Sequence, residues 1–163
     1  MQTLDRDQVT TRIEAPPDRV YALVADVTRT PELSPEVVSC AWLDGATEAA
    51  VGSRFEAVNK GRRGPTWKNR PVVLAAEPGR EFAFSRTEKL SGTVVWRYRL
   101  APEGAGTQVT ESYEVTRPVS RIGWFVIERL FGGRDRRSEL RHGMEETLER
   151  LRQVAEREQT PHR

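Results

Sequence analysis

Residues 92–100 read GTVVWRYRL, and residues 107–116 read TQVTESYEVT. In the first stretch the large apolar side chains Val94, Trp96 and Tyr98 alternate with polar or charged neighbours, and the second stretch alternates in a similar way. This two-residue period is typical of a strand with one buried face. The segment between them, PEGAG, is rich in turn residues, so the two strands are predicted to form an antiparallel hairpin.

Working outward from this hairpin, the same period recurs without intervening helices. Turn signals such as Asp44-Gly45 and Glu77-Pro78-Gly79 separate the segments. Strands joined directly by turns imply an antiparallel meander. A first strand and two short helices, the first opened by Pro16-Pro17, precede this meander. The upstream strands are predicted at residues 9–14, 37–43, 54–59, 66–76 and 81–87.

The C-terminal segment has a helical period. One stripe is apolar while glutamates and arginines cover the opposite side, so we expect this helix to pack across the concave face of the sheet. The apolar stretch 122–131 before it is predicted to form a turn or short helix, either as a lid or packed over the open end of the sheet. The stripe consists of Leu140, Met144, Thr147, Leu148, Leu151 and Val154.

Composition narrows the class of protein. The 163 residues fit one domain, predicted over 8–157 with a frayed tail at 158–163, and 37% apolar residues can fill one core. A formal charge of +2 is too weak for a nucleic-acid binder. No apolar run approaches the roughly 20 residues of a membrane span. Without a signal-like N-terminus and with the single cysteine Cys40, the chain is expected to be soluble and cytoplasmic.

The order of elements, together with local motifs, resembles the START-like or SRPBCC superfamily, which includes the Bet v-type helix-grip proteins. The motifs are APPDRVY at 15–21, EPGREFAF at 77–84, and WRY at 96–98 followed by GTQVT at 106–110. The resemblance implies an α+β helix-grip fold: a curved antiparallel sheet around a long C-terminal helix, two short helices after strand 1, and a ligand cavity between sheet and helix. The chain is similar to actinobacterial proteins labelled polyketide cyclase/dehydrase.

Arg70 and Glu111 are the candidate polar groups of that cavity. The resemblance to aromatic polyketide cyclases implies that Arg70 holds a polyketide oxygen and stabilises enolate charge; the alternative is a surface arginine. Glu111 interrupts an apolar row, and an unpaired buried carboxylate costs several kcal/mol. We therefore predict a pairing of Glu111 with Arg70 or Arg97, the alternative being a wet cavity mouth. At the positions of the cyclases' aromatic cluster and tyrosine this chain has Thr30, Ser34 and Val37.

The remaining candidates are apolar or aromatic, and the alternative for them is a plain role in the core. No catalytic residue is assigned beyond the candidate Arg70. The two histidines, His142 and His162, and the single cysteine are too few ligands for a metal site, and neither a metal nor a cofactor is expected. The full predicted ligand-binding set is Arg70, Phe84, Trp96, Tyr98, Glu111, Tyr113, Leu140, Met144 and Thr147.

The function that these features favour is binding of a small hydrophobic molecule such as a lipid, polyketide or aromatic metabolite. One alternative is an aromatase/cyclase that acts on a poly-β-keto chain with Arg70 as enolate clamp. Another is a toxin-like or co-chaperone interaction module. The expected partner is thus a small ligand and not a nucleic acid. Transient membrane contact is a further expectation, through the basic turn at Lys60, Arg62 and Arg63 and the apolar segment 122–127. The alternative for the turn is a solvated loop.

Overall fold

The computed structural model describes residues 4–88, 92–131 and 135–159. The chain begins with β1 (Arg6–Ile13), α1 (Pro17–Ala25), a short 3-10 helix (Val27–Arg29) and α2 (Thr30–Leu33). Strands follow: β2 (Val37–Trp42), β3 (Phe55–Asn59), β4 (Trp67–Asn69), β5 (Val72–Glu77), β6 (Glu81–Glu88), β7 (Gly92–Glu103) and β8 (Gly106–Arg117). The described chain ends with α3 (Arg121–Phe131) and α4 (Arg136–Gln159).

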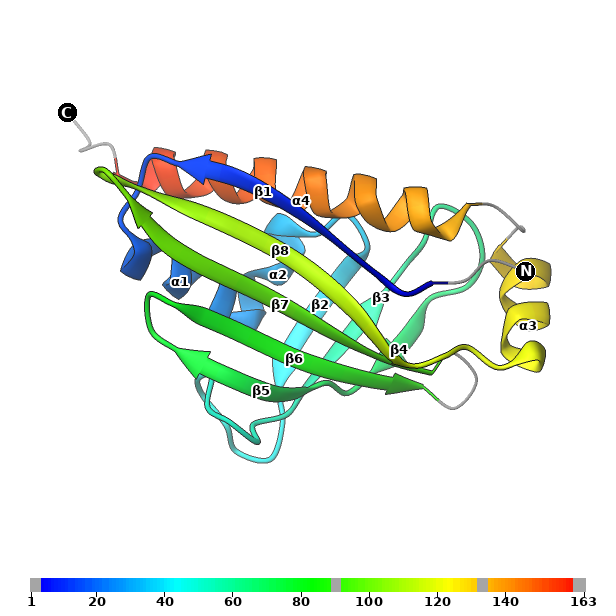
Figure 1. Cartoon of the computed structure of the whole chain (residues 1–163). Helices are drawn as coiled ribbons and strands as arrows, with labels where there is room; N and C mark the ends of the chain where they lie inside the picture. The colour runs from blue at the N-terminus through cyan, green and yellow to red at the C-terminus, as the bar shows by residue number, and fades with distance from the viewer. Residues whose placement is uncertain (1–3, 89–91, 132–134, 160–163) are drawn as a thin grey trace.

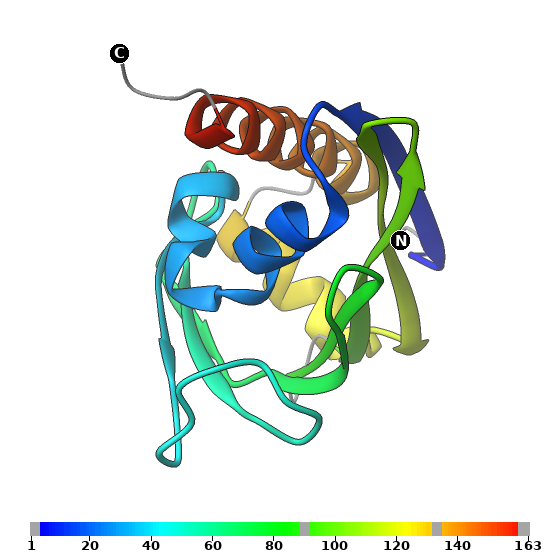
Figure 2. The same cartoon turned by 90° about the vertical axis from the view of Figure 1, so that its left-hand side faces the viewer.

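The strands form two antiparallel sheets that curve around α4 (Figure 1). The larger sheet has the order β1-β8-β7-β6-β5 and the smaller one the order β2-β3-β4. Seen end-on, α4 lies across the opening between the two sheets, and α1 and α2 occupy the end that faces the viewer (Figure 2). The predicted α+β helix-grip architecture, with two short helices after the first strand, is confirmed.

One predicted strand, residues 66–76, is in fact two. β4 ends at Asn69 and pairs with β3, whereas β5 begins at Val72 and pairs with β6. Pro71 lies between them, and proline has no N–H for a sheet ladder and restricts the residue before it. The chain therefore changes partner at this point, and the predicted single sheet divides into two.

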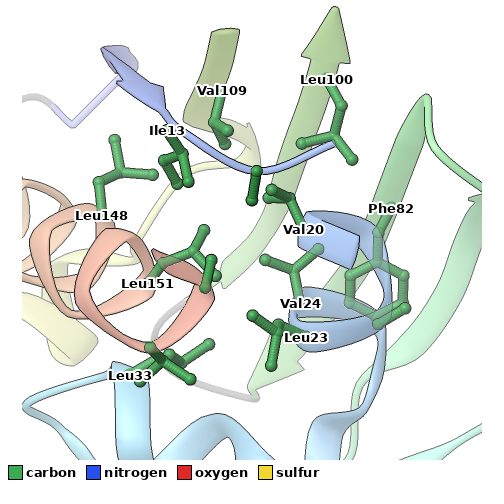
Figure 3. Close-up of a cluster of buried hydrophobic side chains, with 14 of the residues drawn as sticks. Ile13, Val20, Leu23, Val24, Leu33, Phe82, Leu100, Val109, Leu148 and Leu151 are labelled. Carbon is green, nitrogen blue, oxygen red and sulfur yellow. The ribbon is translucent and has the colours of Figure 1, made fainter. Parts of the chain in front are cut away.

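The buried stripe of α4 is confirmed. All six predicted stripe residues are buried, and the C-terminal ones pack against α1 and the larger sheet. Figure 3 shows Leu148 of α4 pointing toward Ile13 of β1 and Leu151 on the side of Val24 of α1, with Phe82 of β6 beyond that helix. Burying side chains of this size contributes about 1.5–3 kcal/mol each, so this cluster holds helix and sheet together.

The apolar stretch before α4 is a helix of its own, α3, located at the end of the molecule opposite α1 (Figure 1). Trp124 is buried, whereas Ile122 and Phe125 are 68% and 64% exposed. Within the described residues, none of the helices is both long and apolar enough to span a bilayer.

The last helix extends two residues beyond 157, the predicted end of the domain. Glu158 belongs to α4 and forms an ion pair with Arg29, with an N–O distance of 2.6 Å. Residues 160–163 of the predicted frayed tail lie outside the described residues.

Candidate functional site

A cavity of about 130 Å³ lies between the two sheets and the N-terminal half of α4. Its walls combine side chains of the short helices, of both sheets and of α4. Most of them are apolar, which is the usual lining of a small-molecule site. The apolar wall includes Leu33, Phe55, Phe82, Phe84, Trp96, Leu140 and Met144.

The α4 wall contains three of the predicted residues, Leu140, Met144 and Thr147, together with Gly143. The Thr147 hydroxyl donates to the Gly143 carbonyl at 2.7 Å, so its hydrogen-bonding capacity is used within the helix. A Cβ placed on Gly143 would meet no atom within 4 Å. The space next to Gly143 is therefore open, and a larger side chain there would extend into it.

Three of the four predicted aromatic residues line the cavity: Phe84, Trp96 and Tyr98. Phe84 lies opposite Trp96 in the β6–β7 register. Tyr113 is different, because it is buried but is not among the cavity-lining residues. It lies opposite Trp96 on β8, with ring centroids 5.4 Å apart, and packs with Met144 as part of the core.

Glu111 lies in the cavity wall and is only 4% exposed. It is directly opposite Tyr98 in the β7–β8 register, and the Tyr98 hydroxyl donates to Glu111 Oε1 at 3.1 Å. The second carboxyl oxygen, Oε2, is buried and has no hydrogen-bond partner among the described residues. Burial raises the pKa of Glu111 to about 8, against a smaller lowering by the Tyr98 hydrogen bond. At neutral pH the carboxyl is therefore mainly protonated.

The predicted pairing of Glu111 with Arg70 is wrong. The Arg70 side chain is 63% exposed, does not line the cavity, and donates to Glu56 Oε2 at 3.2 Å. The alternation along β4 explains this placement, because Trp67 and Asn69 line the cavity and the residues between and after them point outward. Arg70 is therefore a surface arginine, which was the alternative interpretation.

The second predicted partner of Glu111 is also elsewhere. Arg97 forms its ion pair with Glu81. Arg97 alternates along β7 with Trp96 and Tyr98, which line the cavity, so it belongs to the opposite face of the strand. In the described residues Glu111 thus has a neutral hydroxyl as its partner, and no cation.

The sequence interpretation missed a group of charges that also line the cavity. Arg86 pairs with Glu88 at 3.1 Å, and Arg136 pairs with Glu36 at 2.7 Å and with Glu139 at 3.4 Å. Burial is the main influence on the pKa of Arg86 and lowers it, although Glu88 acts in the opposite direction. Arg86 could have been found, because it follows Phe82 and Phe84 at the two-residue spacing of one strand face.

Other reactive groups are poorly placed for chemistry. Cys40 lines the cavity, but burial raises its thiol pKa to about 11, with a smaller lowering by Thr30, so the nucleophilic thiolate is scarce. His142 has an 82% exposed side chain near Glu145. Within residues 4–88, 92–131 and 135–159, no three His, Cys, Asp or Glu side chains cluster as metal ligands.

Solved structures with the same fold include several of known origin. A Polyketide_cyc-like protein from Corynebacterium glutamicum is 32% identical, with 99% of each chain covered and a TM-score of 0.60. The structure of protein CV1439 from Chromobacterium violaceum is 17% identical, with 94% of this chain and 99% of that chain covered and a TM-score of 0.70. The di-domain ARO/CYC StfQ of the steffimycin biosynthetic pathway is 14% identical with a TM-score of 0.75; 94% of this chain matches 51% of that one.

Comparison with curated proteins finds no match. A family model described as polyketide cyclase/dehydrase and lipid transport matches residues 7–156, which is nearly the whole chain. This match shows that the chain belongs to the polyketide cyclase/dehydrase and lipid transport family, and the helix-grip architecture agrees with the predicted START-like fold.

Proposed function

We propose that the protein binds a small, largely apolar molecule in the cavity between the sheets and α4. The observation that carries the proposal is the open space next to Gly143. Glycine within a helix costs about 1 kcal/mol relative to alanine, yet here no neighbouring atom requires it. A glycine that faces unfilled space in a cavity wall is expected where the space itself is useful.

The size of the cavity limits the ligand. An apolar protein cavity of about 150 Å³ holds one benzene molecule. The cavity here, about 130 Å³, therefore suits a one-ring or compact two-ring body, or a short acyl segment of equal volume, unless the walls move. Lipids, polyketides and aromatic metabolites all contain such segments, and the experiments below start from the compact aromatic ones.

A titration followed by ¹H–¹⁵N NMR tests the proposal. Naphthalene added to the wild-type protein should shift the backbone signals of cavity residues such as Phe84, Trp96 and Met144 in a saturable way. Gly143→Leu should fill the cavity and abolish these shifts, whereas the matched control Gly143→Ala should retain them. Absence of saturable shifts in the wild type, or shifts that persist in Gly143→Leu, would contradict binding at this site.

The aromatase/cyclase alternative loses its proposed clamp, because Arg70 lies outside the cavity. The likeness to aromatase/cyclase structures is at 14% and 20% identity and therefore concerns the fold. The interaction-module alternative requires no cavity at all. A mainly apolar cavity whose wall also carries a few polar and charged groups favours ligand binding over both alternatives.

Membrane contact through α3 is a second element of the proposal. Exposed Ile122 and Phe125 lie on this helix with exposed Arg121 and Arg129, a combination suited to the surface of an anionic bilayer. Wild-type protein should therefore sediment with vesicles that contain phosphatidylglycerol more than with neutral vesicles. Phe125→Glu should abolish this sedimentation, while Val51→Glu, at an exposed apolar residue in the β2–β3 loop, should not. Equal sedimentation of all three proteins would contradict the contact.

A further inference from the structure

We propose that Glu111 and Tyr98 form a polar recognition site inside the cavity that selects ligands with a hydrogen-bond acceptor oxygen, such as a ketone, ester or ether, on an apolar body. This inference rests on the proposed function, since it assigns the chemistry of a ligand in the same cavity. It does not depend on Arg70, and it replaces the predicted Arg70–Glu111 clamp with a neutral pair.

The geometry supplies a donor without a partner. Tyr98 already donates to Glu111 Oε1, so the proton of a neutral Glu111 carboxyl belongs on Oε2. That oxygen is buried, has no partner among the described residues, and lies on a residue of the cavity wall. Buried polar atoms in native proteins are nearly always hydrogen-bonded, so an atom in this position indicates a group that arrives from the cavity.

The surroundings keep this carboxyl neutral. Across the β1–β8 ladder its neighbour is the apolar Val9, and across β7–β8 it is Tyr98. The other charged groups that line the cavity have ionic partners: Arg86 pairs with Glu88, and Arg136 pairs with Glu36 and Glu139. Burial raises the pKa of Glu111, the Tyr98 hydrogen bond lowers it by a smaller amount, and no cation among the described residues contributes.

A neutral carboxyl distinguishes between ligands. It donates one strong hydrogen bond to a carbonyl or ether oxygen, which an apolar molecule of the same shape cannot accept. Leaving such a buried donor unpaired costs enough to produce a preference of about tenfold for the oxygen-bearing ligand. When the carboxyl ionises, it can only accept, and this preference should disappear.

The experiment uses indane and 1-indanone, fused-ring molecules that differ by one carbonyl group, and measures their Kd by NMR titration. For the wild type at pH 6.5, 1-indanone should bind about tenfold more tightly than indane. This ratio is corrected for the different free energies of transfer of the two molecules from water to an apolar phase. At pH 9.5 the preference should fall at least threefold. Glu111→Gln keeps a donor and should show a preference that does not change with pH, whereas Glu111→Leu should show none.

Glu56→Gln is the matched control, because it neutralises a glutamate on the outer face of β3 that pairs with Arg70. It should leave the preference and its pH dependence unchanged. Equal affinities of the wild type for the two molecules, or a preference that survives in Glu111→Leu, would overturn this inference while leaving apolar binding in place. If neither molecule binds to any variant, the proposed function itself fails. Should Glu111→Leu not fold, the comparison of wild type with Glu111→Gln across pH decides the question.

Discussion

The two halves of α4 contact the same curved sheet, but one half is tightly packed and the other borders a cavity. In the C-terminal half, Leu148, Leu151 and Val154 belong to a core cluster that includes α1 and β1. In the N-terminal half, Leu140 and Met144 line the cavity. The difference arises because α1 fills the space between the sheets and α4 at one end of the molecule (Figure 2). An equally apolar stripe can thus pack into a filled core at one end and border a cavity at the other.

The largest expected effect tests this contrast directly. Leu151→Ala should lower the free energy of unfolding by about 3–5 kcal/mol, because the residue is fully buried in a filled cluster. Met144→Ala should cost about 2 kcal/mol, because Met144 already faces empty space on one side. Urea unfolding monitored by circular dichroism measures both. Equal losses would indicate that the two halves of α4 are packed alike.

The next effect concerns the pH dependence of stability. The pKa of Glu111 is raised to about 8 by burial, from an ordinary value of 4.5, so the folded state binds an extra proton between these pH values. Stability from this group is fully present below about pH 4.5 and is lost as the pH rises to about 8. Glu111→Gln removes this pH dependence. At pH 9 its free energy of unfolding should therefore exceed that of the wild type by about 2–4 kcal/mol.

Urea unfolding of both proteins between pH 5 and 9 checks this expectation, because all other titrating groups are shared and cancel in the difference. The advantage of Glu111→Gln should grow with pH and level off above about pH 8. A difference that is constant with pH would mean that Glu111 is ionised in the folded protein throughout.

A smaller, stabilising effect is expected at the cavity wall. Gly143→Ala should raise the free energy of unfolding by about 1 kcal/mol, because alanine favours the helix and its Cβ meets no atom within 4 Å. Gly79 provides the contrast: its φ is +73°, and a Cβ there would lie 2.6 Å from Asp18 Oδ1, so Gly79→Ala should destabilise. Thermal melting distinguishes the two signs. A loss of stability in Gly143→Ala would show that the space is filled.

The smallest effect is expected outside the cavity. Arg70→Ala removes an exposed ion pair with Glu56, which should change stability little because solvent screens the two charges. Its affinity for 1-indanone should equal that of the wild type, as should that of Lys68→Ala, which removes the other cation on Glu56. A loss of affinity of more than threefold in Arg70→Ala, but not in Lys68→Ala, would show that Arg70 contacts the ligand.

Much of the site could be predicted from periodicity. The alternation of Trp96 and Tyr98 along one strand and of Glu111 along the next identifies three cavity-wall residues, and the helical stripe identifies Met144. Tyr113 has the same alternation yet lies in the core, where it packs with Val94, Leu140 and Met144. Periodicity specifies the face of a strand, but not whether the space above that face is filled.

Local sequence alone determined the order of strands and helices, the buried face of each, and the isolation of Glu111 in an apolar row, because these follow from backbone geometry and side-chain spacing. Tertiary structure decided the rest. The chain changes sheets at Pro71, Arg70 lies on the outer surface beside Glu56, and the β7–β8 register makes Tyr98 the partner of Glu111. Partners and cavities depend on which distant segments meet, and no short-range pattern in the chain contains that information.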